Sequence, residues 1–399
     1  MIRFFLKTFL NKQADLCKMT TEVEERHADA HQGVLAKGCE LCITGEKSVF
    51  FVTGVCPRHC FYCPISEQKW QKDEIYINEW KTDDFNNIIK EIQLCKSKGV
   101  GITGGDPLAR VDRTAQFIKM LKERFGKEFH IHLYTSLNLF TEENLKKLYD
   151  AGLDEIRCHP DVDDKKYWER IKNGTKFPWH FGMEIPAIPG KEKETIELIN
   201  FAKQYVQFIN LNELEYSDTN AAQFDKGKYL TKNTLSYGIK GSEDFAKALL
   251  KQFKEDKVRI HYCSSAFKDN IQMARRIKKR AESIMTAKEE MTEDGTIMKG
   301  IVYLKEFVPG VGYKKKLEAV ENKEELLQKL AAARECLLQK KIVTNIDVDT
   351  RKYRLLCPIR EIKRKMCAKA VKEAGYVPAV VEEYPTQDAF EVEVDFLHK

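Results

Sequence analysis

The chain has 399 residues, of which 43% are hydrophobic and 32% charged, so it is long enough for two domains or for one large domain with an appendage. Its net charge is +6, from 67 basic and 61 acidic residues, which is too weakly basic to indicate a nucleic-acid-binding protein by itself. The twelve cysteines are clustered and do not follow the even spacing of a disulfide framework, which favours a reducing, cytoplasmic location. No run of about 18 apolar residues occurs, so no membrane span is predicted.

Residues 1–47 are predicted to form an N-terminal extension. Its first ten residues are apolar but short, and Lys7 interrupts them, so we expect them to pack on the protein; an amphipathic membrane contact is the alternative to this packing. Further along, Gly38-Cys39-Glu40-Leu41-Cys42 is a CxxC knuckle, a spacing that lets two thiolates face one metal ion. Alone, it is half of a metal site.

From residue 48 the chain alternates between predicted strands and helices. Short apolar runs predict the strands, and apolar residues at helical spacing predict the helices. The expected strands are 48–55, 99–105, 130–135, 153–159, 181–188 and 207–214, with a shorter strand at 258–262. The expected helices between them are 83–97, 113–124, 141–151, 164–172, 191–204 and 242–253. Alternating βα units predict an α/β fold with a parallel sheet.

After residue 265 the pattern changes. A long charged helix is predicted over 270–290, and it forms most of a linking segment, 266–289. Residues 290–399 then read as a separate small α+β domain, with strand-like stretches at 297–306, 347–356 and 391–396 and helices at 324–338 and 359–374. No internal repeat is evident.

Three cysteines, Cys56, Cys60 and Cys63, follow the first predicted strand in a CxxxCxxC spacing. Three thiolates on one tight loop can ligate three irons of a [4Fe–4S] cluster, and the fourth iron would then lack a protein ligand. The alternative is a structural zinc site, although zinc usually takes four protein ligands. The spacing therefore favours a cluster with one iron open to a small chelating molecule.

This cysteine loop, set directly after a strand, resembles that of the radical S-adenosylmethionine (SAM) superfamily, in which the open iron binds the amino and carboxylate groups of SAM. The six βα units extend the resemblance over about residues 45–265 and imply a partial (β/α)6 TIM-like barrel, here assigned to residues 48–265. Met183-Glu184-Ile185-Pro186-Ala187-Ile188-Pro189-Gly190 resembles the same strand in activating enzymes of glycyl-radical proteins. The nearest match that we expect is to archaeal-type uncharacterised proteins related to pyruvate formate-lyase activating enzyme.

The resemblance also implies a SAM site at the ends of the predicted strands. Gly104-Gly105-Asp106 stands where the family usually has a GGE-type motif, and glycines let the backbone approach a ligand closely. Aspartate in place of glutamate is a departure that leaves the backbone role intact. Arg157 is expected to grip the SAM carboxylate, and His159 and Asp161 the ribose hydroxyls; a structural role for His159 is the alternative. The SAM-binding set that the resemblance implies is Tyr62, Gly104, Gly105, Asp106, Arg157, His159 and Ile188, with Ile188 packing on adenine.

A second metal site is predicted from Cys39, Cys42 and Cys263. Cys263 ends the short strand 258–262, which is expected to return close to the N-terminal extension. Three cysteines there could bind an auxiliary iron–sulfur cluster or zinc. The alternative is that they are ordinary buried cysteines, which behave as small hydrophobic residues. No catalytic residue beyond the ligands of the main cluster is assigned.

The implied activity is the reductive cleavage of SAM to a 5′-deoxyadenosyl radical that modifies a substrate, with an electron donor such as ferredoxin or flavodoxin. A tRNA or protein substrate is the first hypothesis, because residues 290–399 enlarge the chain beyond a simple activating enzyme and residues 351–372 are rich in Lys and Arg. A radical SAM enzyme acting on a small metabolite is the alternative. A non-catalytic iron–sulfur or zinc sensor is a third hypothesis, and the polar residues at successive strand ends argue against it.

Overall fold

A computed structural model of the protein describes residues 23–26, 29–217, 219–224 and 228–397. The apolar segment 1–10 lies outside the described residues. The chain divides into two compact units, Met1–Gln93 with Ser97–Met273, and Leu94–Lys96 with Ala274–Lys399. No helix among the described residues is long and apolar enough to cross a membrane.

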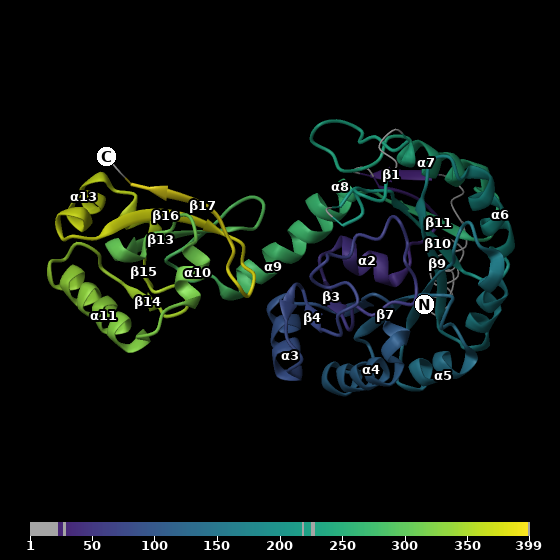
Figure 1. Ribbon diagram of the computed structural model, residues 1–399, viewed down its shortest axis with the longest axis horizontal. Coiled ribbons are helices and arrows are strands. Elements are labelled where there is room, and N and C mark those ends of the chain that lie inside the picture. Colours follow the sequence, from purple (N-terminus) through teal and green to yellow (C-terminus); the bar gives the residue numbers. More distant parts are fainter. Residues whose placement is uncertain (1–22, 27–28, 218, 225–227, 398–399) are drawn as a thin grey trace, which may run out of the picture. The chain divides into compact units, whose positions relative to one another are not determined.

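An eleven-stranded sheet, in the order β1-β2-β11-β10-β9-β8-β7-β6-β3-β4-β5, organises the first unit (Figure 1). The seven central strands from β11 to β3 all pair in parallel, and antiparallel strands flank them at both ends. The bounds are β1 Val23–Arg26, β2 Asp29–Gln32, β3 Lys47–Phe51, β4 Tyr76–Ile77, β5 Trp80–Lys81, β6 Gly99–Thr103, β7 His130–Ser136, β8 Glu155–His159, β9 His180–Ala187, β10 Phe208–Glu213 and β11 Arg259–Cys263. The fold is α/β with a central parallel sheet, as the alternating pattern predicted.

Helices connect these strands and cover the sheet. Their bounds are α2 Lys37–Ile43, α3 Phe85–Leu94, the 3-10 helix η1 Pro107–Arg110, α4 Val111–Phe125, α5 Glu142–Asp150, the 3-10 helix η2 Lys165–Lys176, α6 Glu192–Ala202, α7 Ser242–Gln252, α8 Ser265–Phe267 and the π-helix η3 Lys268–Met273. Thr141 caps α5, because its hydroxyl accepts a hydrogen bond from the Asn144 amide. Apolar side chains such as Ile118 and Leu121 of α4 pack with the alternate residues Ile131 and Leu133 of β7 in one large core.

The other face of the sheet is polar, which is unusual because central parallel strands are normally apolar on both faces. Helix α2 lies on this face, which we call the α2 face, and Figure 1 shows α2 surrounded by β3, β7 and β9 to β11. Successive strands present a polar side chain there, because alternate residues of a strand point to opposite faces. These residues are His132, Tyr134, Glu155, Arg157, His159, Glu184, Asn210, Asn212 and His261.

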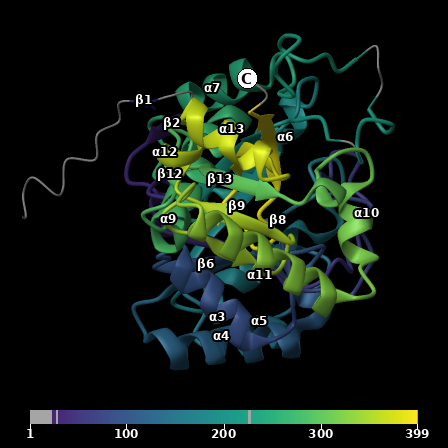
Figure 2. The same ribbon diagram turned by 90° about the vertical axis from the view of Figure 1, so that its left-hand side faces the viewer.

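The second unit is built on a six-stranded antiparallel sheet, β14-β15-β13-β16-β17 with β12 beside β13. Helices α11, α12 and α13 pack on one face of it, as Figure 2 shows for the yellow-green part of the chain. The bounds are α9 Ala274–Ile284, β12 Glu290–Met291, β13 Ile297–Tyr303, the 3-10 helix η4 Lys305–Phe307, α10 Tyr313–Glu318, α11 Lys323–Gln339, β14 Asp347–Asp349, β15 Arg354–Cys357, α12 Ile359–Ile362, α13 Lys365–Glu373, β16 Val377–Glu383 and β17 Glu391–Phe396.

Several predicted elements differ from the structure. The helix predicted over 270–290 is shorter and is divided into η3 and α9. Residues 347–356 form parts of two strands, β14 and β15, and residues 359–374 form two helices, α12 and α13, while β16 was not predicted at all. The CxxC segment is a turn of helix α2 and not a knuckle. The predicted linking segment 266–289 contains the point, after Met273, where the two compact units divide.

Candidate functional site

The three loop cysteines line one cavity of about 410 Å³ in the first unit. Cys56, Cys60 and Cys63 lie on the connection from β3 to β4, so all three come from one short segment. Other residues of the same connection, from Arg58 to Trp70, also line the cavity. The rest of the lining comes from the C-terminal ends of β6, β7 and β8, from Glu184 and Asn212 on β9 and β10, and from residues 219 and 223. The cysteine loop and the polar strand ends, which lie far apart in the sequence, therefore share one pocket.

Arg58, inside the cysteine motif, attaches the loop to the end of β8. Its Nη1 donates a hydrogen bond to the carbonyl oxygen of His159 at 2.8 Å, and its Nη2 pairs with the Asp161 carboxylate at 2.9 Å. Asp161, expected to bind ribose, is thus engaged by Arg58. No role was predicted for Arg58, although its position between the first two cysteines was the available signal.

Tyr62 and His159 make a second connection between the loop and β8. The Nδ1–H of His159 donates to the Glu184 carbonyl oxygen at 2.6 Å, so its Nε2 accepts the hydrogen bond from the Tyr62 hydroxyl at 2.8 Å. Burial, together with the nearby Arg58 cation, lowers the pKa of His159 to about 4. His159 is therefore neutral at pH 7. Both predicted residues line the pocket, and their polar atoms hold the loop in place.

Gly104 and Gly105 bring the end of β6 against the start of the cysteine loop. A Cβ atom on Gly104 would lie 2.4 Å from the Thr53 carbonyl oxygen, and one on Gly105 would lie 2.5 Å from the Val55 carbonyl oxygen. Only glycine allows this approach, because real Cβ contacts are not that short. Both glycines line the pocket, so their main chain is open to a ligand there.

Asp106 connects the ends of β6 and β7 through hydrogen bonds. It is fully buried and its carboxylate accepts hydrogen bonds from the Leu108 amide, the Thr135 hydroxyl and both the amide and the hydroxyl of Ser136. Burial raises the pKa of Asp106, and these donors oppose the rise. Asp106 does not line the pocket. Its contribution in this structure is to orient Thr135 and Ser136, which do line it.

The three thiols of the loop are protonated when no metal is bound. Burial raises the pKa of Cys56 to about 11, and it raises the pKa of Cys60 and Cys63 as well. Thiolates are the form that ligates iron, so cluster binding at this loop must release protons. The donor set fits a cluster held by three cysteines, since all three cysteines line the same cavity as Gly104 and Gly105.

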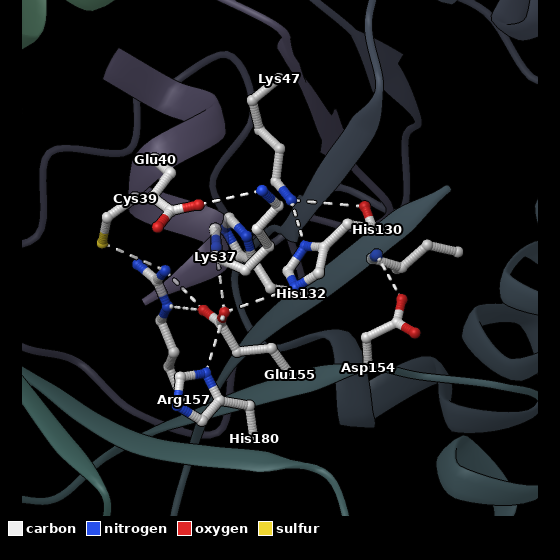
Figure 3. A network of polar contacts seen from close by, with 12 residues as sticks. Lys37, Cys39, Glu40, Lys47, His130, His132, Asp154, Glu155, Arg157 and His180 are labelled. Carbon is white, nitrogen blue, oxygen red and sulfur yellow. Dashed lines mark hydrogen bonds and ion pairs between the residues drawn. The ribbon is translucent and has the colours of Figure 1, made fainter. Parts of the chain in front are cut away.

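Arg157 lies beneath the pocket and does not line it. Its Nε donates to Glu155 Oε1 at 2.7 Å, its Nη1 to Glu184 Oε2 at 2.8 Å and its Nη2 to Cys39 Sγ at 3.3 Å. Figure 3 shows the guanidinium between Cys39 and Glu155. With its donors engaged and its side chain 3% exposed, Arg157 is not placed to grip a carboxylate of SAM. Its role in SAM binding stays a prediction.

Ile188 and the segment after β10 form an apolar wall beside the cysteine loop. Ile188 packs with Leu214, Phe224, Tyr229 and Ile239, and the loop side chains Phe61 and Tyr62 lie against this cluster. Ile188 does not line the pocket, so the structure does not place it for contact with adenine. Asn220 donates to the Tyr62 carbonyl oxygen at 3.2 Å, and its neighbours Thr219 and Gln223 line the pocket. Sequence reasoning missed this segment because its pattern is irregular.

The second cysteine set is spread over two elements. Cys39 Sγ accepts hydrogen bonds from Arg157 and Asn210, Cys42 lies one turn further along α2, and Cys263 Sγ accepts from Gln272. The described residues hold no group of three or more His, Cys, Asp or Glu side chains already arranged around one metal position, and this covers both cysteine sets. None of Cys39, Cys42 and Cys263 lines the pocket, so a second metal site stays a prediction.

Comparisons with known proteins agree with this geometry. Residues 50–206 match the model of the radical SAM superfamily. The chain is 37% identical over 384 residues to a protein of Methanocaldococcus jannaschii that carries the provisional name glycyl-radical enzyme activating enzyme, covering 94% of this chain and 96% of that protein. The chain belongs to the radical SAM superfamily. The protein is accordingly an enzyme of the radical SAM type, a class that binds a [4Fe–4S] cluster and SAM.

More distant relatives match only part of the chain. A PqqA peptide cyclase of Bradyrhizobium diazoefficiens is 30% identical over 113 residues, 28% of this chain and 26% of that protein. A GTP 3′,8-cyclase of Staphylococcus haemolyticus is 25% identical over 223 residues, 51% of this chain and 64% of that protein. These two enzymes have different substrates, so superfamily membership does not define the substrate of this chain.

Proposed function

We propose that this chain is a radical SAM activating enzyme that removes a hydrogen atom from a glycine residue of a partner protein. The observation that carries the proposal is the shared cavity, which Cys56, Cys60 and Cys63 line together with Gly104 and Gly105. The 37% identity to the Methanocaldococcus protein, which extends over 94% of this chain, supports a protein substrate. An RNA or a small metabolite is the alternative substrate.

In this proposal Cys56, Cys60 and Cys63 hold the [4Fe–4S] cluster, which when bound supplies the electron that cleaves SAM to methionine and a 5′-deoxyadenosyl radical. The main chain of Gly104 and Gly105 holds the methionine part of SAM. Thr135 and Ser136, oriented by Asp106, offer hydroxyl groups to the rest of the molecule. The protein thus contributes position and exclusion of water, while the cofactors carry the bond cleavage.

The proposal also includes the domains of the chain, the electron donor and a second metal. We assign residues 48–265 to a partial (β/α)6 barrel, with residues 1–47 as an N-terminal extension and 290–399 as a C-terminal domain that recognises the partner. A cytoplasmic ferredoxin or flavodoxin would supply the electron. An auxiliary iron–sulfur cluster or zinc at Cys39, Cys42 and Cys263 would be a second metal, additional to the reaction described above.

The test begins with anaerobic reconstitution, reduction by dithionite and addition of SAM. We expect about four irons per chain and formation of 5′-deoxyadenosine, and we expect both to be lost in a Cys56→Ala/Cys60→Ala/Cys63→Ala variant. Cys336→Ala, a half-buried cysteine on α11, is the matched control and should retain both. If 5′-deoxyadenosine does not form while the cluster is intact and reduced, the radical assignment is wrong.

The substrate is tested separately with a glycyl-radical-type protein from the same source organism. The expected result is an electron paramagnetic resonance doublet from a glycine radical that forms only with the chain, SAM and reductant together. Formation of 5′-deoxyadenosine without this signal, but with hydrogen transfer from RNA or from a metabolite, would replace the protein substrate by one of those alternatives. Iron and zinc counts in the wild type and in a Cys39→Ala/Cys42→Ala variant test the second metal: an unchanged iron count near four, with no zinc in either protein, excludes it.

A further inference from the structure

Two glutamates line the pocket: Glu67, on the segment after Cys63, and Glu184, on the sheet at its floor. Glu184 belongs to β9, and its side chain is 14% exposed and lines the cavity with Asn212 of β10. Its carbonyl oxygen accepts the hydrogen bond from His159, so the residue is fixed by its backbone as well as its side chain. No step of the proposed function uses it.

Three donors hold this carboxylate in one orientation. Arg157 Nη1 and Asn210 Nδ2 donate to Oε2 at 2.8 and 2.9 Å, and Asn212 Nδ2 donates to Oε1 at 2.8 Å. An ionised carboxylate accepts about four hydrogen bonds, so Oε1 keeps one acceptor position. Among the described residues, none donates a hydrogen bond to Asn212 Oδ1. Two acceptor atoms from neighbouring strands are therefore available in the pocket.

The charge near this floor favours a cation. Burial alone would raise the pKa of Glu184, but Arg157, Asn210 and Asn212 bring it below its usual range, so Glu184 is ionised at pH 7. Arg157 is shared with Glu155, which leaves one guanidinium between two carboxylates. Two further cations lie near. Arg58 lines the same pocket but pairs with Asp161, and Lys268 interacts by charge with Glu215 as well as with Glu184.

We infer that Glu184 and Asn212 form a subsite for a positively charged nitrogen group of the substrate, an ammonium or a guanidinium, whose N–H donors reach Glu184 Oε1 and Asn212 Oδ1. This inference rests on the proposed function, in which the main chain of Gly104 and Gly105 would hold the methionine part of SAM, whose sulfonium has no N–H to donate. Glu184 then acts as a residue that selects and positions the substrate.

The probes are two small molecules deuterated at the methylene carbon: glycinamide, which is mostly protonated at pH 7, and N-acetylglycinamide, which carries no charge. In the labelled reaction dithionite supplies the electron that cleaves SAM. A C–D bond of the probe breaks, a C–D bond forms in 5′-deoxyadenosine, and the probe is left as a carbon radical. The fraction of 5′-deoxyadenosine that carries deuterium measures how well the probe is positioned.

With the reconstituted wild-type chain, we expect about tenfold more label from glycinamide than from N-acetylglycinamide, since a hydrogen bond to a charged group is worth more than a neutral one. Glu184→Gln should reduce this ratio to near one while leaving iron content, the equilibrium affinity for SAM and the total yield of 5′-deoxyadenosine unchanged. Glu123→Gln, an exposed glutamate on α4, is the matched control and should keep the wild-type ratio.

Three outcomes would overturn the inference. Equal labelling from both probes in the wild type, or no labelling at all, shows that no cation subsite lies within reach of the radical. A tenfold weaker affinity of Glu184→Gln for SAM assigns the carboxylate to SAM. Absence of 5′-deoxyadenosine from every sample is a different result, because it refutes the proposed function and not this inference alone.

Discussion

At the scale of single residues, two glycines bring the end of β6 against the start of the cysteine loop. The Gly105 amide donates to the Thr53 carbonyl oxygen at 2.7 Å, while its α-carbon faces the carbonyl oxygens of Gly54 and Val55. An alanine there must displace backbone, since its Cβ would lie 2.5 Å from both oxygens. The segment displaced is the one that leads directly into Cys56.

We predict that Gly105→Ala weakens SAM binding at least tenfold and lowers the iron content after reconstitution. Equilibrium binding of SAM to the anaerobic protein measures the first effect, and iron analysis the second. Gly310→Ala is the control, because a Cβ at Gly310 meets no atom within 4 Å and should change neither. Wild-type affinity in Gly105→Ala would show that the loop adapts and that the close approach is not required.

His130 gives the folded chain a pH dependence with a definite sign. Its Nδ1 accepts from Lys47 Nζ at 2.7 Å, and burial together with the Lys47 cation lowers its pKa to about 3. In the unfolded chain its pKa is about 6.5. Below pH 6.5 the unfolded chain therefore binds a proton that the folded chain does not, and stability falls as the pH drops towards 3.

We predict that this one histidine removes about 2 kcal/mol of unfolding free energy between pH 7 and pH 4.5. His130→Asn cannot be protonated, so its stability should fall less over the same interval by about that amount. Urea unfolding of the metal-free proteins at the two pH values measures the difference. Equal losses in the variant and the wild type would mean that His130 is protonated in the folded state.

At the scale of elements, the central strands were predictable because each is a short apolar run bounded by turn residues. The sequence could not show that one face of their sheet is polar, since the helix that lies on that face comes from residues 37–43, outside the βα pattern. Cys39 and Cys42 suggested a metal knuckle by their spacing, whereas the tertiary contacts of Cys39 with Arg157 and Asn210 place it among charged groups. Arg157 was assigned to SAM for the same reason: strand-end position was visible, and its buried partners were not.

Helix α2 packs closely on the α2 face of the sheet at Gly38. The Gly38 amide donates to Glu155 Oε2 at 3.0 Å, and a Cβ on Gly38 would lie 2.4 Å from His132 Nδ1 and 2.5 Å from Arg157 Nη2. The neighbouring helix residue Lys37 is different, because its side chain is 58% exposed. The start of α2 is therefore fixed on one side only.

We predict that Gly38→Ala destabilises the first unit by about 2 kcal/mol, because a methyl group inserted into a packed polar site forces side chains to move. Lys37→Ala should change the unfolding free energy by less than about 0.5 kcal/mol, as exposed substitutions do. Urea unfolding followed by far-ultraviolet circular dichroism compares the two. A Gly38→Ala variant as stable as Lys37→Ala would show that α2 does not depend on this contact.

At the scale of the whole molecule, each compact unit has its own hydrophobic core. The core of the first unit joins the central strands to α4, α5, α6 and α7, and that of the second joins β13, β15 and β16 to α11, α12 and α13. All residues of the cavity that holds Cys56, Cys60 and Cys63 belong to the first unit. A change confined to the core of the second unit should therefore leave the chemistry of the pocket intact.

Arg354 provides that change, since it is a fully buried cation inside the second unit. It pairs with Asp349 at 3.0 Å, with Glu391 at 2.9 Å and with Glu383. Arg354→Met would leave these carboxylates without their shared partner, and breaking a buried ion pair costs about 3 kcal/mol or more. Lys352 and Lys299 also contact Glu383 and offset part of this loss.

We predict that thermal unfolding of Arg354→Met shows an earlier transition for the second unit, while iron content and 5′-deoxyadenosine formation keep their wild-type values. A single transition shifted as a whole, with loss of the cluster, would mean that the two units unfold together.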